Sequence, residues 1–120
     1  MSREIFWSID AGDLLISGGN FWRGRPDGLP VLDIMLDRDR EAAFILLDPP
    51  AGGGHVRNLL LIGPTGDIRW RAELPDVIGA DAFVSMAFAD DGSIVSGTWS
   101  GYRVRIDPAS GRLLEQTFTK

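Results

Sequence analysis

Short apolar stretches alternate with turn-forming residues along the whole chain of 120 residues. Several stretches alternate between apolar and polar positions, as in residues 102–106, where Val104 falls on one face and two arginines on the other. Such alternation is typical of strands with one buried and one solvated face. Gly, Pro, Asn and Asp dominate the intervening segments and favour tight turns. The pattern predicts strands near residues 4–8, 14–17, 32–36, 43–47, 58–62, 67–73, 83–88, 94–98, 102–106 and 112–118.

Residues 37–47 also allow a helix, because Asp37 could cap its start and Glu41, Ala42 and Ala43 favour helical structure. Every other stretch favours strand, and the expected fold class is all-β. The segment 76–82 is compatible with either a loop or a single helical turn, and the pattern does not choose between them.

A weak internal repeat indicates the architecture. Residues 31–74 read as strand, acidic turn, strand, long loop, strand, Pro-Gly turn and strand, and residues 83–118 repeat this order without the long loop. Four antiparallel strands in roughly 36 to 45 residues is the size of a propeller blade. We therefore expect a single all-β domain over residues 1–120. It comprises two blade-like four-stranded antiparallel units and an N-terminal hairpin, closing as a small sandwich or barrel-like domain.

Two hairpins carry a family resemblance. Residues 100–113, SGYRVRIDPASGRL, and residues 61–70, LIGPTGDIRW, resemble the hairpins of PQQ-type β-propeller repeats. Together with residues 20–24 and 117–120, they also resemble a group of small uncharacterised bacterial β proteins of similar length. The resemblance implies propeller-like hairpins but no cofactor, because the same hairpin occurs in propellers that bind none. A closed ring usually takes four to eight blades. The chain either closes on itself or completes a ring with further copies, and we expect a monomer.

Composition excludes several classes of function. Twelve Lys and Arg against seventeen Asp and Glu give a net charge of -5, the opposite of the balance that nucleic-acid binders show. The absence of cysteine excludes disulfides, thiolate metal sites and cysteine nucleophiles. The longest apolar run, residues 42–47, is too short for a membrane-spanning helix, and the N-terminus has no signal-peptide core. We expect a cytoplasmic protein that binds neither nucleic acid nor membrane.

The residues offer weak support for catalysis or metal binding. His55 is the only histidine and follows three glycines, which is typical of a solvated loop. A phosphate-binding loop would need a helix after Gly54, whereas a strand is predicted there. The acidic pairs at 37/39 and 90/91 lack the further oxygen ligands of a calcium loop. We expect no enzyme and no catalytic, cofactor or metal site, with a hydrolase that uses two of the thirteen aspartates as an unsupported alternative.

The aromatic residues are the best candidates for recognition. Trp7 and Trp70 fall within strand patterns and are expected in the core. Other large rings lie beside glycine-rich turns, where they can reach the surface, and Trp, Tyr and Arg are frequent interface anchors. The same rings could instead fill the open ends of a small β fold. The candidate partner-binding residues are Trp22, Arg23, Trp99 and Tyr102.

Small size, acidity and the lack of catalytic motifs favour a non-catalytic protein-binding module. The version we expect is an immunity-type protein that binds and neutralises a cognate bacterial toxin domain. Toxin domains that act on nucleic acid present basic clefts, and an acidic partner is steered to such clefts quickly. The alternatives are an oligomeric propeller-like protein that binds a sugar or cofactor, and a structural protein.

Overall fold

The computed structural model describes residues 4–37 and 39–119 and contains three antiparallel sheets. The N-terminal sheet consists of β1 (Phe6–Asp10), β2 (Asp13–Ser17) and β3 (Trp22–Gly24). The central sheet has the order β4 (Val31–Asp37), β5 (Ala42–Leu47), β7 (Leu59–Ile62) and β8 (Ile68–Arg71). The C-terminal sheet has the order β10 (Ala87–Phe88), β11 (Ile94–Gly97), β12 (Tyr102–Ile106) and β13 (Leu113–Phe118). The connecting segments form a short 3₁₀ helix η1 (Pro26–Gly28) and a parallel pair of strands, β6 (His55–Val56) and β9 (Asp81–Ala82).

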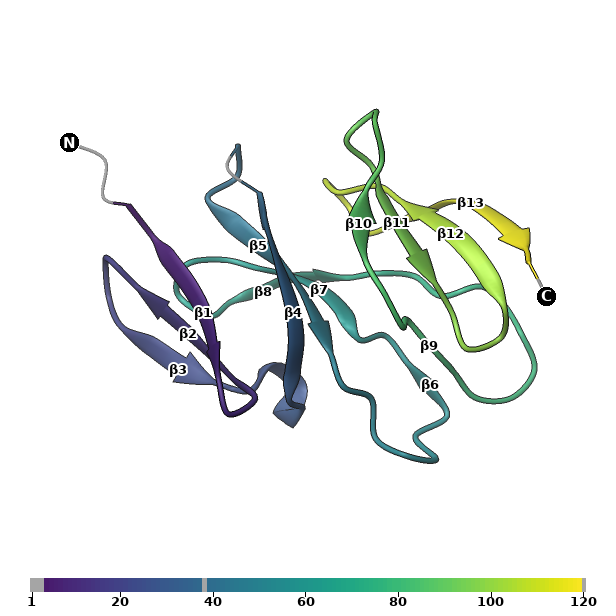
Figure 1. Cartoon of the computed structure of the whole chain (residues 1–120), viewed down its shortest axis with the longest axis horizontal. Helices are drawn as coiled ribbons and strands as arrows, with labels where there is room; N and C mark the ends of the chain where they lie inside the picture. The colour runs from purple at the N-terminus through teal and green to yellow at the C-terminus, as the bar shows by residue number, and fades with distance from the viewer. Residues whose placement is uncertain (1–3, 38, 120) are drawn as a thin grey trace.

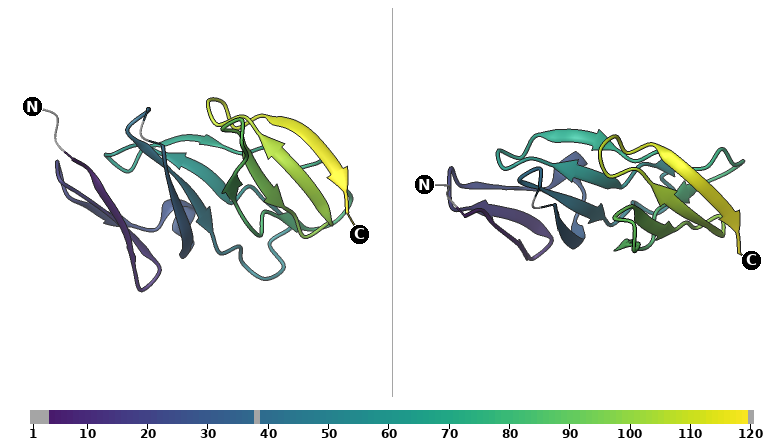
Figure 2. Two further views of the ribbon diagram at one scale, coloured as in Figure 1. Left: turned by 45° about the horizontal axis from the view of Figure 1, so that its top comes forward. Right: turned by 90° about the horizontal axis from the view of Figure 1, so that it is seen from above.

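The three sheets stand in a row in chain order, along the 47 Å long axis of the molecule (Figure 1). The two further views show the same row (Figure 2). The central sheet therefore has neighbours on both faces. Every residue of β5 and β7 is buried, and both strands read as unbroken apolar runs. The helix alternative for residues 37–47 is wrong, because a strand covered on both faces lacks the alternation that separates strand from helix.

Two apolar layers hold the row together. In the first layer, Leu14 and Ile16 of the N-terminal sheet belong to one cluster with Ile45 and Leu60 of the central sheet. The second layer joins the other face of the central sheet to the C-terminal sheet, and its buried residues include Phe44, Leu61, Ile94, Val104 and Ile106. Burial of large aliphatic side chains on both faces is the main stabilising contribution to the central sheet.

A tryptophan on the last strand of one sheet packs over a glycine turn of the next sheet. The Trp22 indole on β3 covers Gly66 in the β7–β8 turn, and the Trp70 indole on β8 covers Gly111 in the β12–β13 turn. Trp70 also donates from Nε1 to the carbonyl of Pro108, at 3.1 Å. The repeated contact shows that β3 and β8 occupy equivalent positions, and that successive sheets are related as successive blades are.

Asn58 joins the central sheet to the segment that leads into the C-terminal sheet. Its buried amide donates to the carbonyls of Leu47 (2.8 Å) and Phe83 (2.9 Å), and its Oδ1 accepts from the Phe83 N–H at 2.8 Å. All these groups are removed from water, so losing one partner would leave a buried polar group unpaired.

The structure confirms an all-β fold with two four-stranded blade-like units. The sheets stack as in a sandwich, and none of those formed by the described residues closes on itself. The N-terminal unit has a third strand, β3, which the sequence pattern did not predict because three residues ending in glycine are too few to show alternation. In the described part of the chain, no helix has the length and apolarity needed to cross a membrane.

Candidate interaction surface

Trp99 lies on the β11–β12 turn at one end of the C-terminal sheet, and 47% of its surface is exposed. Its backbone N–H donates to the carbonyl of Ala82 at 3.1 Å. On the other side of the turn, Thr119 donates from its backbone N–H and its hydroxyl to the carbonyl of Gly101, both at 2.8 Å. The turn is thus held from both sides while the indole remains accessible.

A buried carboxylate fixes the turn from below. Asp81 is fully buried and accepts from the backbone N–H of Ser100 at 3.0 Å and from its hydroxyl at 2.8 Å. Thr98 extends this network, since its hydroxyl lies 2.9 Å from the Ser100 hydroxyl and accepts from the Tyr102 N–H at 3.2 Å. Sequence reasoning missed Asp81 because it lies in the segment 76–82, which the pattern left undecided.

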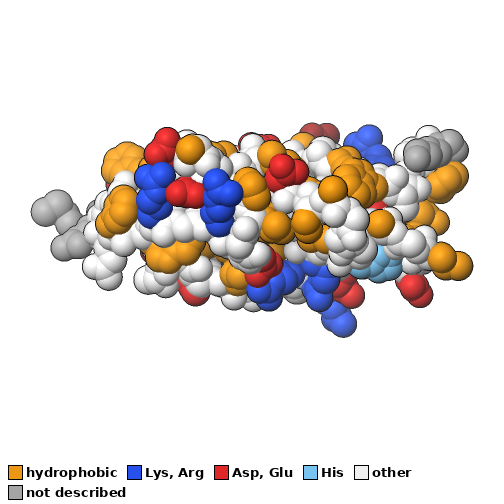
Figure 3. All heavy atoms as spheres, turned by 90° about the horizontal axis from the view of Figure 1, so that it is seen from below, with side chains coloured by type: hydrophobic (Ala, Val, Ile, Leu, Met, Phe, Trp, Pro, Cys, Tyr) orange, Lys and Arg blue, Asp and Glu red, His pale blue; other side chains and the backbone are white. Residues whose placement is uncertain are grey.

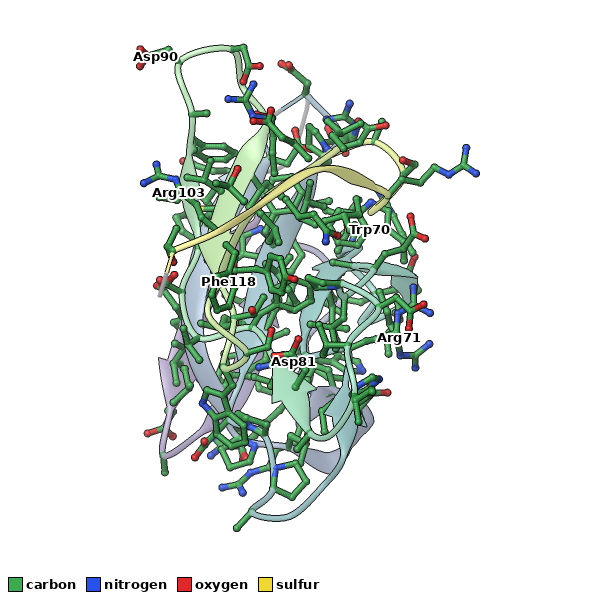
Figure 4. The ribbon with its side chains drawn as sticks, turned by 90° about the vertical axis from the view of Figure 1, so that its right-hand side faces the viewer. Trp70, Arg71, Asp81, Asp90, Arg103 and Phe118 are labelled. Atoms are coloured by element: carbon green, nitrogen blue, oxygen red, sulfur yellow. The ribbon has the colours of Figure 1, made fainter. Side chains whose placement is uncertain are left out.

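Aromatic side chains lie beside this turn. Tyr102 stacks edge-to-face on Phe118, with ring centroids 5.3 Å apart, and 57% of Phe118 is exposed. Figure 4 shows Phe118 on the near end of the molecule, with Asp81 below it. Seen from below, hydrophobic side chains are exposed along the whole length of the molecule, including the end that holds the C-terminal sheet (Figure 3). Trp99, Tyr102 and Phe118 together are called the Trp99 surface from here on.

The structure does not bring all four predicted partner-binding residues together. Trp22 and Arg23 belong to β3 in the N-terminal sheet, and the central sheet separates them from Trp99 and Tyr102. Trp22 is half-buried over Gly66, so its ring fills a space in the fold. Of the three predicted partner-binding aromatic residues, Trp22 and Tyr102 are half-buried and only Trp99 is exposed.

Arg23 takes part in a small ion-pair network. Its guanidinium binds Asp10 at 3.1 Å and Asp13 at 2.9 Å, and Arg25 binds Asp13 at 2.8 Å. Hydrogen bonds from Arg25 and Arg23 lower the pKa of the Asp13 carboxyl, and the bonds to Asp13 and Asp10 raise the pKa of Arg23. The charge of Arg23 is already matched by acids of its own sheet, which leaves less of it for a partner.

A second exposed surface is the outer face of the C-terminal sheet. A shallow hollow of about 490 Å³ there is lined by Val95, Arg103, Arg105, Glu115 and the acidic β10–β11 turn. Arg105 binds Asp91 at 3.0 Å and Glu115 at 3.8 Å. Hydrogen bonds from Ser93, assisted by the charge of Arg105, lower the pKa of Asp91. The hollow is charged and open to solvent on a sheet face that no described element covers.

The residues considered for catalysis do not converge on a reaction site. His55 is exposed on β6. Ser100 bonds directly to Asp81, with no histidine between them to act as a base. Within the ranges 4–37 and 39–119, no group of three or more His, Asp or Glu side chains is placed to hold a metal ion.

Comparison with known proteins gives a family and a fold. Residues 32–118 match the family described as "Domain of unknown function (DUF7957)". The chain belongs to this family. The matched residues comprise almost all of the central and C-terminal sheets, whereas the N-terminal sheet lies outside the match. The sequence matches none of the curated proteins.

Two solved structures share the arrangement of strands. The computationally designed Ika8 protein has a TM-score of 0.62 and 17% identity, covering 100% of this chain and 35% of that chain. BamB from Moraxella catarrhalis has a TM-score of 0.57 and 19% identity, covering 98% of this chain and 33% of that chain. BamB is a β-propeller of PQQ-like repeats, so the propeller-like resemblance is confirmed at the level of fold. This chain spans about a third of the length of the solved structures it matches.

Proposed function

We propose that this protein is a non-catalytic protein-binding module that presents the Trp99 surface to its partner. The observation that carries the proposal is the exposed indole of Trp99 on a turn fixed by buried Asp81. Because the backbone of this turn is already fixed, less conformational entropy is lost when a partner docks on the ring that it carries. Tyr102 directly follows this turn and stacks on Phe118, so the two rings offer further aromatic surface at the same end of the sheet.

The charge of the chain supports a basic partner. With a net charge of -5, the protein attracts a basic surface over a distance and accelerates the encounter. We therefore propose an immunity-type role, in which the partner is a cognate bacterial toxin domain with a basic cleft that this protein blocks.

The test begins with an affinity-tagged full chain used to capture partners from a lysate of the source organism. The affinity of the purified partner is then measured for the wild type and for Trp99→Ala. We expect a loss of more than about 2 kcal/mol, roughly 30-fold in Kd, because a central aromatic anchor is removed. The matched control is Phe21→Ala, which removes a ring that is 69% exposed in the β2–β3 turn. Equal affinities of wild type and Trp99→Ala would exclude the Trp99 surface.

The immunity role needs a further assay. Co-expression of this chain with the captured partner should restore growth if the partner is toxic, and Trp99→Ala should restore it less. A captured partner that is not toxic when expressed alone contradicts the immunity role and leaves the binding module intact.

One observation favours an oligomeric propeller-like protein that binds a small molecule. The chain spans about a third of the length of the similar solved structures, which would suit a ring of several copies. The charged outer face of the C-terminal sheet opposes such stacking, because Arg103 and Arg105 would be buried against the next copy. Light scattering of the pure protein distinguishes a monomer from an oligomeric ring. A monomer would exclude the ring.

A further inference from the structure

The N-terminal sheet is one strand short of the other two. Trp22 on β3 and Trp70 on β8 make the same contact with the next sheet, so β3, β2 and β1 correspond to β8, β7 and β5. In the central sheet β4 pairs with the remaining edge of β5, and in the C-terminal sheet β10 pairs with β11 in the same way. Among the described residues, no strand pairs with the corresponding edge of β1.

A groove lies beside this open edge. It has a volume of about 350 Å³, and its apolar lining includes Ile5 and Trp7 from β1 and Leu36 from β4. Leu36 is 45% exposed, although its neighbour in the sheet, Ala43, is fully buried. In Figure 1 the side of β1 that faces away from β2 is directed toward β4. A strand added to β1 would therefore cover apolar side chains that the N-terminal and central sheets leave accessible.

The charged residues that line the groove are all acidic among those described, namely Glu4, Asp37 and Glu41. Arg40 binds Asp37 at 2.6 Å. Glu4 and Glu41 are both exposed, so their negative charge is accessible to a segment in the groove. This charge favours a segment that carries lysine or arginine.

We propose that the edge of β1 binds an extended segment of a partner protein by strand addition. The segment pairs antiparallel to β1, in the position that β4 and β10 take in the other sheets. Alternate apolar side chains face Trp7 and Leu36, and a basic side chain lies near Glu4 and Glu41. Main-chain hydrogen bonds provide the affinity in such complexes, and the side-chain pockets provide the specificity. This site lies on the N-terminal sheet and is separate from the Trp99 surface.

The probe is an eight-residue peptide of alternating valine and lysine with blocked ends, titrated into the full-length ¹⁵N-labelled chain. We expect amide exchange in Phe6–Asp10 to slow in the presence of the peptide, because free edge amides become hydrogen-bonded. A peptide with glutamate in place of lysine should bind about tenfold more weakly at low salt. Unchanged exchange in β1 at saturating peptide, or equal binding of both peptides, overturns the proposal.

Matched charge variants locate the site. Glu4→Lys combined with Glu41→Lys should weaken peptide binding about tenfold at low salt. The control combines Asp90→Lys and Glu115→Lys, which changes the net charge equally but lies on the C-terminal sheet, and it should stay within about twofold of wild type. Equal weakening by both pairs would mean non-specific charge attraction and overturn the proposal.

The same measurements of amide exchange and peptide binding also test what occupies the edge of β1 and whether this site is independent of the Trp99 surface. If β1 amides become protected as the concentration of the protein alone rises, the edge is covered by a second copy, and the proposal of a partner segment is wrong. Trp99→Ala should bind the peptide as the wild type does, so a failure at β1 and a failure at the Trp99 surface are distinguishable.

Discussion

The central and C-terminal sheets have the same strand order and matching registers. They differ completely in one row of side chains, the outward row, which crosses the face directed away from the N-terminal sheet. Across the central sheet the row Met35, Phe44, Leu61 and Trp70 faces the C-terminal sheet. Across the C-terminal sheet the equivalent row is Ala87, Val95, Arg105 and Glu115, and it faces solvent.

This difference shows what sets the character of a sheet face. The backbone of the C-terminal sheet could receive another sheet, but stacking would bury Arg105 and Glu115, and burying charged groups is unfavourable. Terminal units of repeat proteins characteristically have polar outer faces for this reason. The side chains of one row, rather than the strand order, therefore make the outer face of the C-terminal sheet a charged, solvated surface.

The largest expected effect comes from truncating equivalent positions in the two rows. Phe44→Ala should lower the free energy of unfolding by about 3–5 kcal/mol, because the ring is buried between Trp70 and Phe88. Val95→Ala, on the solvent side of the C-terminal sheet, should cost less than about 1 kcal/mol. Urea unfolding at pH 7 measures both. Similar losses would show that the outer face of the C-terminal sheet is covered in solution.

The next effect tests the contacts of tryptophan with glycine turns. Gly66, Gly92 and Gly111 all have positive φ, but an added Cβ would overlap a tryptophan ring at Gly66 and Gly111 and would meet nothing within 4 Å at Gly92. Gly92→Ala should cost about 1–2 kcal/mol for backbone strain alone. Gly66→Ala and Gly111→Ala should cost about 1–3 kcal/mol more through overpacking. If thermal or urea unfolding shows the same loss of free energy of unfolding for all three variants, the indoles do not hold the sheets together.

A smaller effect concerns an ion pair of the central sheet for which the C-terminal sheet has no counterpart at the equivalent described position. Arg71 on β8 binds Asp27 of η1 at 2.9 and 2.7 Å, whereas the equivalent residue of β13 is Gln116. The hydrogen bond from Arg71 lowers the pKa of Asp27 below its ordinary 3.8, so the pair stabilises the fold above that value. This stabilisation is lost as the pH falls through the lowered pKa.

Asp27→Asn should therefore lower the free energy of unfolding by about 1 kcal/mol at pH 7, and the difference from wild type should shrink below about pH 4. Asparagine tolerates the positive φ of 54° at this position, so backbone strain stays nearly constant. Asp90→Asn serves as the control in urea unfolding across this pH range. A loss that persists unchanged at pH 2 would point to packing rather than charge.

The smallest effect on stability is expected from Arg105→Leu, which makes the outward row of the C-terminal sheet resemble that of the central sheet. The exposed ion pairs of Arg105 contribute little, so the free energy of unfolding should change by less than about 0.5 kcal/mol. The larger apolar patch should instead promote self-association, visible in sedimentation velocity. Arg112→Leu, at an exposed turn, is the control and should remain as monodisperse as the wild type.

Alternating stretches such as residues 102–106 could be assigned from the sequence, because alternation and turn residues depend on neighbours in the chain. The helix alternative for residues 37–47 arose where alternation fails, since β5 is covered on both faces. Trp22 and Trp99 both lie beside glycine-rich turns. Nothing in the neighbouring sequence tells that the Trp22 ring covers Gly66 whereas the Trp99 ring stays exposed. Asp81 gave no signal at all, because its partner Ser100 is nineteen residues away.

The sequence by itself determined the longer strands, most turns and the repetition of a four-stranded unit, since these follow from periodicity and turn chemistry within about forty residues. It did not predict the short strands β3, β6 and β9, and it predicted a strand over residues 83–88 where β10 comprises only Ala87–Phe88. Only the tertiary structure decided which row of each sheet is buried, because that depends on the sheet that stands beside it. It also decided that no other described strand pairs with the second edge of β1, and that Asp81 fixes the Trp99 turn. Both features arise from pairing between distant segments, which local patterns do not encode.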